Sequence, residues 1–114
     1  MLISEVSKTM DISADTLRYY EKIGLIPDVK RNKSGIRDYS EDDLMWIQFA
    51  KCMRSAGLSI EVLTEYLKLF KEGDSTLEVR KDILVEERSK LINKISDIQS
   101  TLERLDYKIS NYEE

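Results

Sequence analysis

Residues 75–114 carry the pattern that most restricts what this chain can fold into. They contain no glycine or proline, and apolar residues recur in them at the alternating spacing that is typical of a coiled coil. The seven-residue series is Leu77, Leu84, Leu91, Ile98, Leu105 and Tyr112, and the complementary positions hold Ile95, Leu102 and Ile109. A helix over this range would be roughly 55 Å long, which is more than a small head could cover.

This apolar seam predicts a partner, and the simplest partner is a second copy of the chain. Each buried leucine or isoleucine contributes about 1.5–3 kcal/mol, so the whole seam is sufficient to hold an obligate homodimer together. We therefore expect a dimer interface at Leu84, Leu91, Ile95, Ile98, Leu102, Leu105 and Ile109. The alternative is that the helix folds back on its own head.

The N-terminal part of the chain predicts a small helical head that begins with two short helices. Apolar residues at helical spacing predict the first helix over 3–10. Ser13 as N-cap and Gly24 as terminator predict the second over 14–23. Asp11 lies in the tight turn between them, where we expect a left-handed backbone. Two helices joined in this way form a helix-turn-helix, whose second helix enters the major groove of DNA.

A basic hairpin, or wing, follows over 29–39. Turn-forming residues at 32–35 separate two short strand-like pieces, and no acidic residue lies between Val29 and Arg37. The cations of this run are Lys30, Arg31, Lys33 and Arg37. Such a wing can follow the phosphate backbone beside the groove that the helix occupies. The alternative for this run alone is a solvated charged loop.

Two more helices complete the head, which we place at 1–73. A capping box that opens with Ser40 predicts a helix over 41–56, and a further apolar stripe predicts another over 60–71. Apolar residues cover most of the circumference of the helix at 41–56, so we expect it to be largely buried. The predicted fold class is therefore mainly α, with a winged helix-turn-helix head and a C-terminal coiled-coil dimerisation helix at 75–114.

Composition narrows the function classes further. With no histidine and one cysteine, the chain lacks the usual zinc ligands, the imidazole-based catalytic triads and any internal disulfide. We expect no metal and no cofactor. The net charge is −4, but residues 1–57 hold nine basic and nine acidic residues, so the excess acid lies in the second half. An acidic second half does not exclude DNA binding by a basic wing.

Neither a membrane segment nor a secretory signal is evident. No apolar run approaches the roughly 20 residues that are needed to span a bilayer. The N-terminal residues also lack the pattern of a secretory signal. We therefore expect a cytoplasmic protein with no membrane partner.

Residues 16–25 closely resemble the recognition helix of the mercury-resistance-regulator (MerR) family of bacterial transcription factors. The run that carries the resemblance is Thr16-Leu17-Arg18-Tyr19-Tyr20-Glu21, followed by Gly24-Leu25. Matches to the wing of the family are Gly35, Arg37 and Tyr39. Ile36 departs from the pattern because the family often has tyrosine there, and Asp11 stands where glycine is usual. The resemblance extends over the whole chain.

The resemblance implies a homodimer, in a bacterial cell, that binds a pseudo-palindromic operator in double-stranded promoter DNA. The expected DNA-binding residues are Ser13, Thr16, Arg18, Tyr19, Tyr20, Lys33, Arg37 and Tyr39. It further implies an antiparallel coiled coil and a promoter that the dimer bends and untwists, so that RNA polymerase meets its two elements realigned. That deformation costs about 1–6 kcal/mol. We expect neither the drug-binding domain nor the cysteine-containing metal loop of other members.

Cys52, the only cysteine, lies in the helix predicted at 41–56. Its surroundings resemble the thiol-based subgroup of the family, in which a lone cysteine in this helix responds to aldehydes or other electrophiles. The neighbouring Lys51 and Arg54 favour the thiolate, whereas the carboxyl end of a helix disfavours it. The alternative is that Cys52 is a small buried hydrophobic residue.

Two other function classes compete with a DNA-binding regulator. A coiled-coil adaptor that binds only protein would explain 75–114 but would leave the basic wing without a purpose. A thiol-dependent enzyme would use Cys52 but needs a base and a pocket that the sequence does not show. We therefore expect a regulator and no enzyme.

Overall fold

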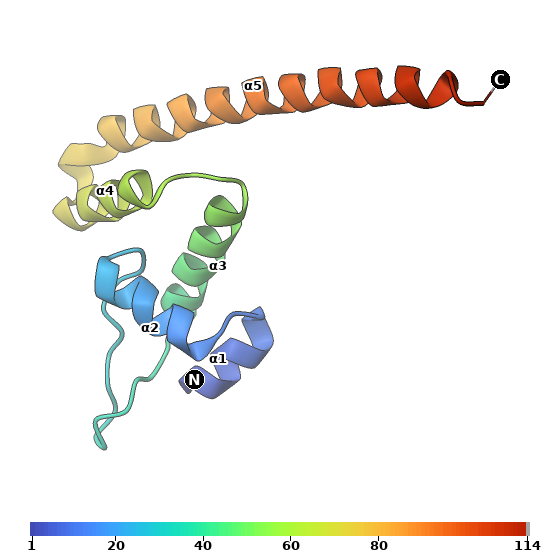
Figure 1. Ribbon diagram of the computed structural model, residues 1–114. Coiled ribbons are helices and arrows are strands. Elements are labelled where there is room, and N and C mark those ends of the chain that lie inside the picture. The colour runs from blue at the N-terminus through green and yellow to red at the C-terminus, as the bar shows by residue number, and fades with distance from the viewer. Residues whose placement is uncertain (114) are drawn as a thin grey trace. The chain divides into compact units, whose positions relative to one another are not determined.

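The computed structural model describes residues 1–113 and is mostly helical (Figure 1). Its helices are α1 (Ile3–Met10), α2 (Ala14–Ile23), α3 (Glu41–Ser55), α4 (Ile60–Glu72) and α5 (Leu77–Ser110), with a 3-10 turn, η1 (Asp74–Thr76), before α5. The chain divides into two compact units, Met1–Arg80 and Lys81–Glu114, here called the head and the C-terminal unit. The predicted fold class, mainly α with a helix-turn-helix and a long last helix, is confirmed.

Capping residues set the limits of the head helices, and the predicted bounds of α1 and α2 agree with the structure. The Ser13 hydroxyl accepts a hydrogen bond from the backbone N–H of Thr16 at 3.0 Å. Ser40 and Asp43 form the expected reciprocal capping box, with N···O distances of 3.2 and 2.9 Å. Asp11 has the left-handed φ of 51° that was expected in the turn between α1 and α2.

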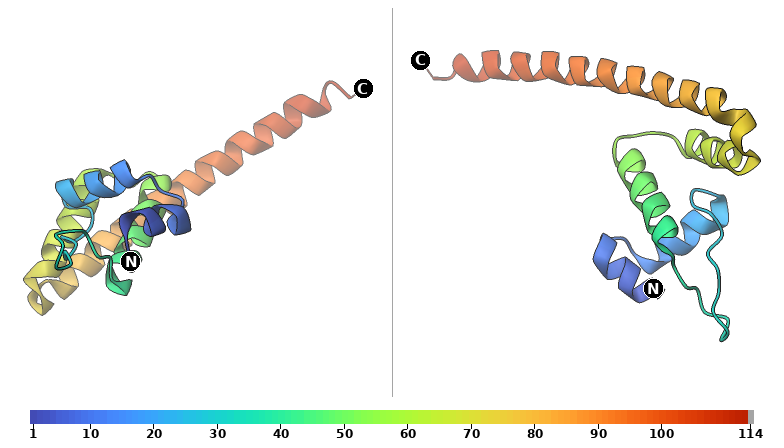
Figure 2. Two further views of the ribbon diagram at one scale, coloured as in Figure 1. Left: turned by 90° about the horizontal axis from the view of Figure 1, so that it is seen from below. Right: turned by 180° about the vertical axis from the view of Figure 1, so that it is seen from behind.

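The core of the head lies where α1, α2 and α3 meet the two ends of the wing. Its members are Val6, Leu17, Ile26, Val29, Tyr39, Ile47 and Ala50. α1 and α2 lie beside the N-terminal half of α3, and the wing loop extends away from the helices (Figures 1 and 2). Because Val29 and Tyr39 belong to the core, both ends of the wing are anchored beside α2.

The wing has less strand structure than the sequence predicts. Within residues 1–113, one isolated antiparallel bridge, between Arg31 and Arg37, joins its two sides. Asn32 supplies further hydrogen bonds, because its Oδ1 accepts from the backbone N–H groups of Ser34 at 2.9 Å and Ile36 at 3.1 Å. A side chain thus replaces part of the ladder that a longer hairpin would form.

α3 is less buried than its apolar sequence predicts. Of its residues, Ile47 and Ala50 are buried, whereas Met45 is 70% exposed and Cys52 is also exposed. α1 and α2 pack against one face of α3, and rings of α4 contact Trp46 and Phe49, but this packing leaves Met45 and Cys52 exposed. The expectation of a largely buried helix is therefore wrong for the single chain.

α5 is one unbroken helix, but it is shorter at both ends than the predicted 75–114. η1 occupies the residues before Leu77, and there the Thr76 hydroxyl donates a hydrogen bond to the Gly73 carbonyl oxygen at 2.8 Å. At the other end the helix stops at Ser110, and the last residue of the predicted range lies outside the described residues. No helix of residues 1–113 is long and apolar enough to cross a membrane.

Candidate nucleic-acid interface

α2 presents one face to the core and another to solvent. Leu17 is fully buried, whereas the next two residues, Arg18 and Tyr19, are exposed. Arg18 Nη1 lies 2.9 Å from Asp15 Oδ1 in an ion pair whose side chains are 49% and 97% exposed. An ion pair so exposed contributes little stability. The Arg18 guanidinium can therefore exchange Asp15 for another anion.

The amino end of α2 adds backbone donors to this solvent face. Ser13 is exposed and Thr16 is half-buried, and their hydroxyl oxygens lie 2.7 Å apart. The first-turn N–H groups of a helix have no intrahelical partner, and they attract phosphate at a helix amino end. The two predicted site residues thus lie together at the amino end of α2.

The wing displays its cations at the surface. Lys30, Arg31 and Lys33 are all exposed. Arg31 Nη1 donates a hydrogen bond to the Gly35 carbonyl oxygen at 2.9 Å, which stabilises the turn. Gly35 itself has a φ of 78°, a left-handed value that favours glycine. The turn is held by its own side chains, and the Lys33 ammonium has no partner within residues 1–113.

Glu21 joins α2 to the wing. Its Oε1 accepts a hydrogen bond from Arg37 Nε at 2.8 Å, and its Oε2 accepts one from the backbone N–H of Val29 at 3.3 Å. The Glu21 and Arg37 side chains are 14% and 24% exposed. The hydrogen bond to Glu21 raises the pKa of Arg37 above its ordinary value. Arg37 therefore fixes the wing against α2, and it is less available to phosphate than the sequence predicts.

Sequence reasoning did not assign Glu21 a role. The pair spans 16 positions in the sequence, and the residues between include a helix end and a turn. One sequence feature points weakly to a role for Glu21. It lies one helical turn after the core residue Leu17, and is therefore near the buried edge of α2. A carboxylate at such an edge needs a cation, and the nearest basic run is the wing.

Two predicted contact residues, Tyr39 and Tyr20, pack in or against the core of the head. Tyr39 is 3% exposed, its hydroxyl is buried, and no hydrogen-bond partner for that hydroxyl lies within residues 1–113. Burial raises the pKa of Tyr39 above its ordinary value. Tyr20 is half-buried and packs against the core. The expectation of a DNA contact from the Tyr39 side chain is corrected here: it is a core residue that anchors the wing.

Cys52 is a free, exposed cysteine near the end of α3. It borders a shallow cavity with Gln48, Lys51, Ser55 and Ala56. The Lys51 ammonium donates a hydrogen bond to the Met10 carbonyl oxygen, so this cation is engaged with α1. The alternative in which Cys52 fills the core is wrong for the single chain. Residues 1–113 contain no group of ligands that could hold a metal ion.

The predicted dimer seam lies on the surface of the single chain. Of the seven seam residues all but the half-buried Leu91 are exposed: Leu84 38%, Ile95 67%, Ile98 65%, Leu102 48%, Leu105 55% and Ile109 54%. Monomeric proteins rarely expose so much contiguous apolar surface. The C-terminal unit thus presents an apolar face that one chain leaves open.

Comparisons with known proteins place this geometry among DNA-binding regulators. The family described as "MerR HTH family regulatory protein" matches residues 1–69. The HTH-type transcriptional regulator AdhR of Bacillus subtilis is 62% identical over 92 residues, which is 81% of this chain and 66% of AdhR. The chain thus spans just under two thirds of the length of that relative.

Solved structures match almost the whole chain. A protein from Listeria monocytogenes, described as belonging to the MerR family of transcriptional regulators, is 52% identical, with a TM-score of 0.96 over 99% of this chain and 86% of that one. HiNmlR, a MerR family regulator that lacks the sensor domain, was crystallised bound to promoter DNA. It is 31% identical, with a TM-score of 0.87 over 98% of this chain and 89% of HiNmlR.

Proposed function

The chain belongs to the MerR family of helix-turn-helix transcriptional regulators, and we propose that it acts as a homodimer on a pseudo-palindromic operator in promoter DNA. The observation that carries this proposal is the arrangement of α2 and the wing. Arg18 and Lys33 are exposed on two elements that the Glu21–Arg37 pair holds together. In this arrangement α2 enters the major groove, and the wing contacts the flanking phosphates.

The likeness to HiNmlR supports this assignment, because that protein was crystallised on promoter DNA and matches the chain over both units. Members of this family are transcriptional regulators and not enzymes, so a thiol-dependent enzyme is excluded. A protein-only adaptor would leave the exposed cations of α2 and the wing without a ligand. The proposed location is the bacterial cytoplasm, on the nucleoid when DNA is bound.

The exposed seam of α5 supports the homodimer. A second copy covers the seam with the same residues, as a two-fold interface requires. The likeness to the MerR family supports an antiparallel direction for this coiled coil. The dimer then presents two α2 helices to successive major grooves, roughly 34–36 Å apart or a multiple of that spacing. We propose that the dimer bends and untwists a promoter spacer, which realigns the two promoter elements for RNA polymerase. The phosphate contacts of the two wings offset the deformation cost.

A salt titration of DNA binding tests this function. The full chain is titrated against a labelled fragment of its own upstream DNA and against an unrelated fragment of equal length. The proposal predicts tighter binding to the upstream fragment and a log–log salt slope that reports several released counterions. Equal, salt-independent binding, or no binding to either fragment, would instead favour the protein adaptor.

We further propose that Cys52 is the effector site and responds to aldehydes or other electrophiles. Its exposure supports this role because a reagent can reach the sulfur. With an aldehyde, the sulfur forms a bond to the carbonyl carbon, and the carbonyl oxygen takes up the proton that the thiol loses. In the proposed dimer, the helix that carries Cys52 packs between the head and the partner's long helix, so the added atoms change the packing of that joint. Overpacking of this kind typically costs about 1–3 kcal/mol, which is enough to bias a two-state dimer.

Substitution of Cys52 separates this effector role from DNA binding. Cys52→Ser and Cys52→Ala should bind DNA like the wild type but should fail to change transcription when an aldehyde is added. Mass spectrometry of the intact wild-type protein shows whether the adduct forms on the timescale of the response. A normal inducible response in a Cys52→Ala strain would place the sensor elsewhere.

A further inference from the structure

An open groove in the head, between α3 and α4, is lined mostly by aromatic side chains. Its volume is about 380 Å³, and its lining residues are Asp42, Met45, Trp46, Phe49, Tyr66 and Phe70. The rings contact one another: the Trp46 and Phe70 centroids lie 4.9 Å apart, and the Phe49 and Tyr66 centroids lie 5.7 Å apart. No residue of the proposed DNA-binding set, and not Cys52, lines this groove.

The groove is a surface feature and not part of the core. Met45 is 70% exposed and Phe70 is 46% exposed. Trp46 is half-buried, so part of its ring lies open between the two helices. A preformed apolar concavity of this size, with few polar groups, is typical of a small-molecule site.

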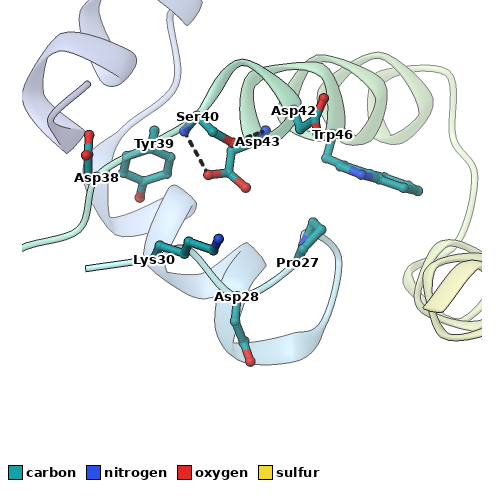
Figure 3. A pocket seen from close by; sticks show the side chains of 9 residues that line it. All are labelled: Pro27, Asp28, Lys30, Asp38, Tyr39, Ser40, Asp42, Asp43 and Trp46. Carbon is teal, nitrogen blue, oxygen red and sulfur yellow. Dashed lines mark hydrogen bonds between the residues drawn. The ribbon is translucent and has the colours of Figure 1, made fainter. Parts of the chain in front are cut away.

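The charge beside the groove is negative. Asp42 and Trp46 lie one turn apart on α3 and therefore on the same side of the helix (Figure 3). The Asp42 side chain is exposed and has no partner within residues 1–113. Both residues also border a second cavity of about 500 Å³, which Asp28, Asp38 and Asp43 line together with Lys30. Asp38 is paired with the N-terminal ammonium of Met1 at 2.7 Å, so the negative charge left there is that of the other carboxylates. An anion would be repelled at this end of the groove.

One ring of the groove already binds a cation within the chain. The Arg80 guanidinium carbon lies 5.2 Å from the centroid of the Phe70 ring, and Arg80 Nε donates a hydrogen bond to the Thr76 hydroxyl at 2.9 Å. The indole of Trp46 is the strongest cation–π partner among the side chains, and within residues 1–113 no cation lies over it. Its exposed part and the Asp42 carboxylate therefore offer a second position for a positive group.

We propose that this groove binds an aromatic organic cation. The positive group lies between the Asp42 carboxylate and the Trp46 ring, and the apolar body packs against Phe49, Tyr66 and Phe70. A neutral apolar ligand would gain the same ring contacts but would partly desolvate Asp42 without a charge to pair with it. The site is separate from the DNA-binding face and from Cys52, so it does not depend on the proposed function.

The fluorescence of Trp46 tests the proposal directly, because it is the only tryptophan of the chain. The full-length protein is titrated with phenyltrimethylammonium and, separately, with tert-butylbenzene, its uncharged isostere. The proposal predicts a saturable change in Trp46 emission, with the cation bound about 2- to 30-fold more tightly than the isostere. Equal affinities, or a change in emission that does not saturate, would overturn it.

Two matched substitutions locate the charge. Asp42→Asn should lower the affinity for the cation and so reduce its preference over the isostere, with the part that the Trp46 ring supplies retained. Glu41→Gln removes an equal charge from the preceding residue, which is exposed and lines neither cavity, so it should leave the affinity unchanged. Equal losses from both variants would contradict a specific Asp42 contact.

A third variant keeps the test decisive if Asp42→Asn impairs folding. Phe70→Leu retains an apolar side chain but removes one ring that the apolar body of the ligand contacts, so it should weaken binding of the cation and of the isostere by a similar factor and leave the preference for the cation unchanged. Unchanged affinities for both ligands in Phe70→Leu, or a loss for the cation alone, measured on protein whose thermal melting is intact, would also contradict the proposal.

Discussion

In the head, Leu17 and Ile47 have no exposed surface, whereas in the C-terminal unit Ile95 and Ile98 are 67% and 65% exposed. The two pairs are chemically alike, so the difference lies in what surrounds them. Three helices converge on the core of the head within one chain. The C-terminal unit is a single helix and can bury a side chain only against another element. Apolar side chains that the chain buries by itself thus mark the head, and apolar side chains that it leaves exposed mark the proposed dimer interface.

The largest expected effect comes from charging the exposed seam. Leu91→Asp combined with Ile98→Asp should abolish the homodimer and leave an unstable monomer or an unfolded chain, because a coiled coil cannot bury carboxylates without partners. Sedimentation velocity measures the loss. The matched control is Ser89→Asp with Ser96→Asp, which adds the same charges at the same spacing outside the seam. If the seam variant sediments as a dimer, the assigned interface is wrong.

The next effect concerns the solvent face of the head. Arg18→Ala should weaken operator binding by about 5- to 150-fold for each lost base contact and should weaken nonspecific binding less. Lys33→Ala should instead weaken binding to all DNA and reduce the salt slope by about one per lost phosphate contact, or about two per dimer. Fluorescence anisotropy with specific and unrelated fragments distinguishes the two.

A matched control for that measurement is Lys68→Ala, which removes an exposed cation from α4. It should change neither the affinity nor the salt slope. Normal operator binding by Arg18→Ala would show that α2 does not read the DNA.

A smaller effect is expected for the pair that joins α2 to the wing. A double-mutant cycle of Glu21→Gln and Arg37→Gln should give a coupling free energy of about 1 kcal/mol or more, because both side chains are mostly buried and share a charged hydrogen bond. Urea unfolding measures this free energy. A coupling near zero would mean that the wing is held by the core alone.

The smallest effect is expected for Tyr39, a buried side chain of the head that was predicted to be exposed to DNA. Tyr39→Phe should stabilise the protein by about 1 kcal/mol at neutral pH, because it removes a buried hydroxyl that has no protein partner. Its DNA affinity should stay unchanged. A loss of DNA affinity would show that the hydroxyl reaches phosphate after a local rearrangement.

Alkaline pH gives a second measurement on the same variant. The folded-state pKa of Tyr39 is raised by burial, so the folded protein holds this proton more tightly than the unfolded chain does. The resulting stability is complete below the unfolded pKa of about 10 and is lost as pH rises through the folded-state pKa. Urea unfolding should therefore show a steeper alkaline loss for the wild type than for Tyr39→Phe. Identical profiles would contradict the buried phenol.

Features set by local chemistry could be predicted from the sequence. The bounds of α1 and α2 follow from Ser13 and the turn at Asp11, because capping and backbone conformation are decided by near neighbours. The seam of α5 also follows from spacing alone. The burial of Tyr39 and the exposure of Cys52 could not be predicted, because burial depends on which face of an element the rest of the fold covers. The Glu21–Arg37 pair escaped prediction for the same reason.

The proposed regulator is a dimer that binds DNA, and sedimentation velocity with a fluorescently labelled fragment of the chain's own upstream DNA tests this most directly. The full chain is measured alone and with the fragment, at the same protein concentration and at low and high salt. We predict a dimer without DNA and two chains per fragment in the complex, with the complex lost at high salt and the dimer retained. A monomer that binds the fragment as one chain, or a dimer that does not bind it, would contradict the account.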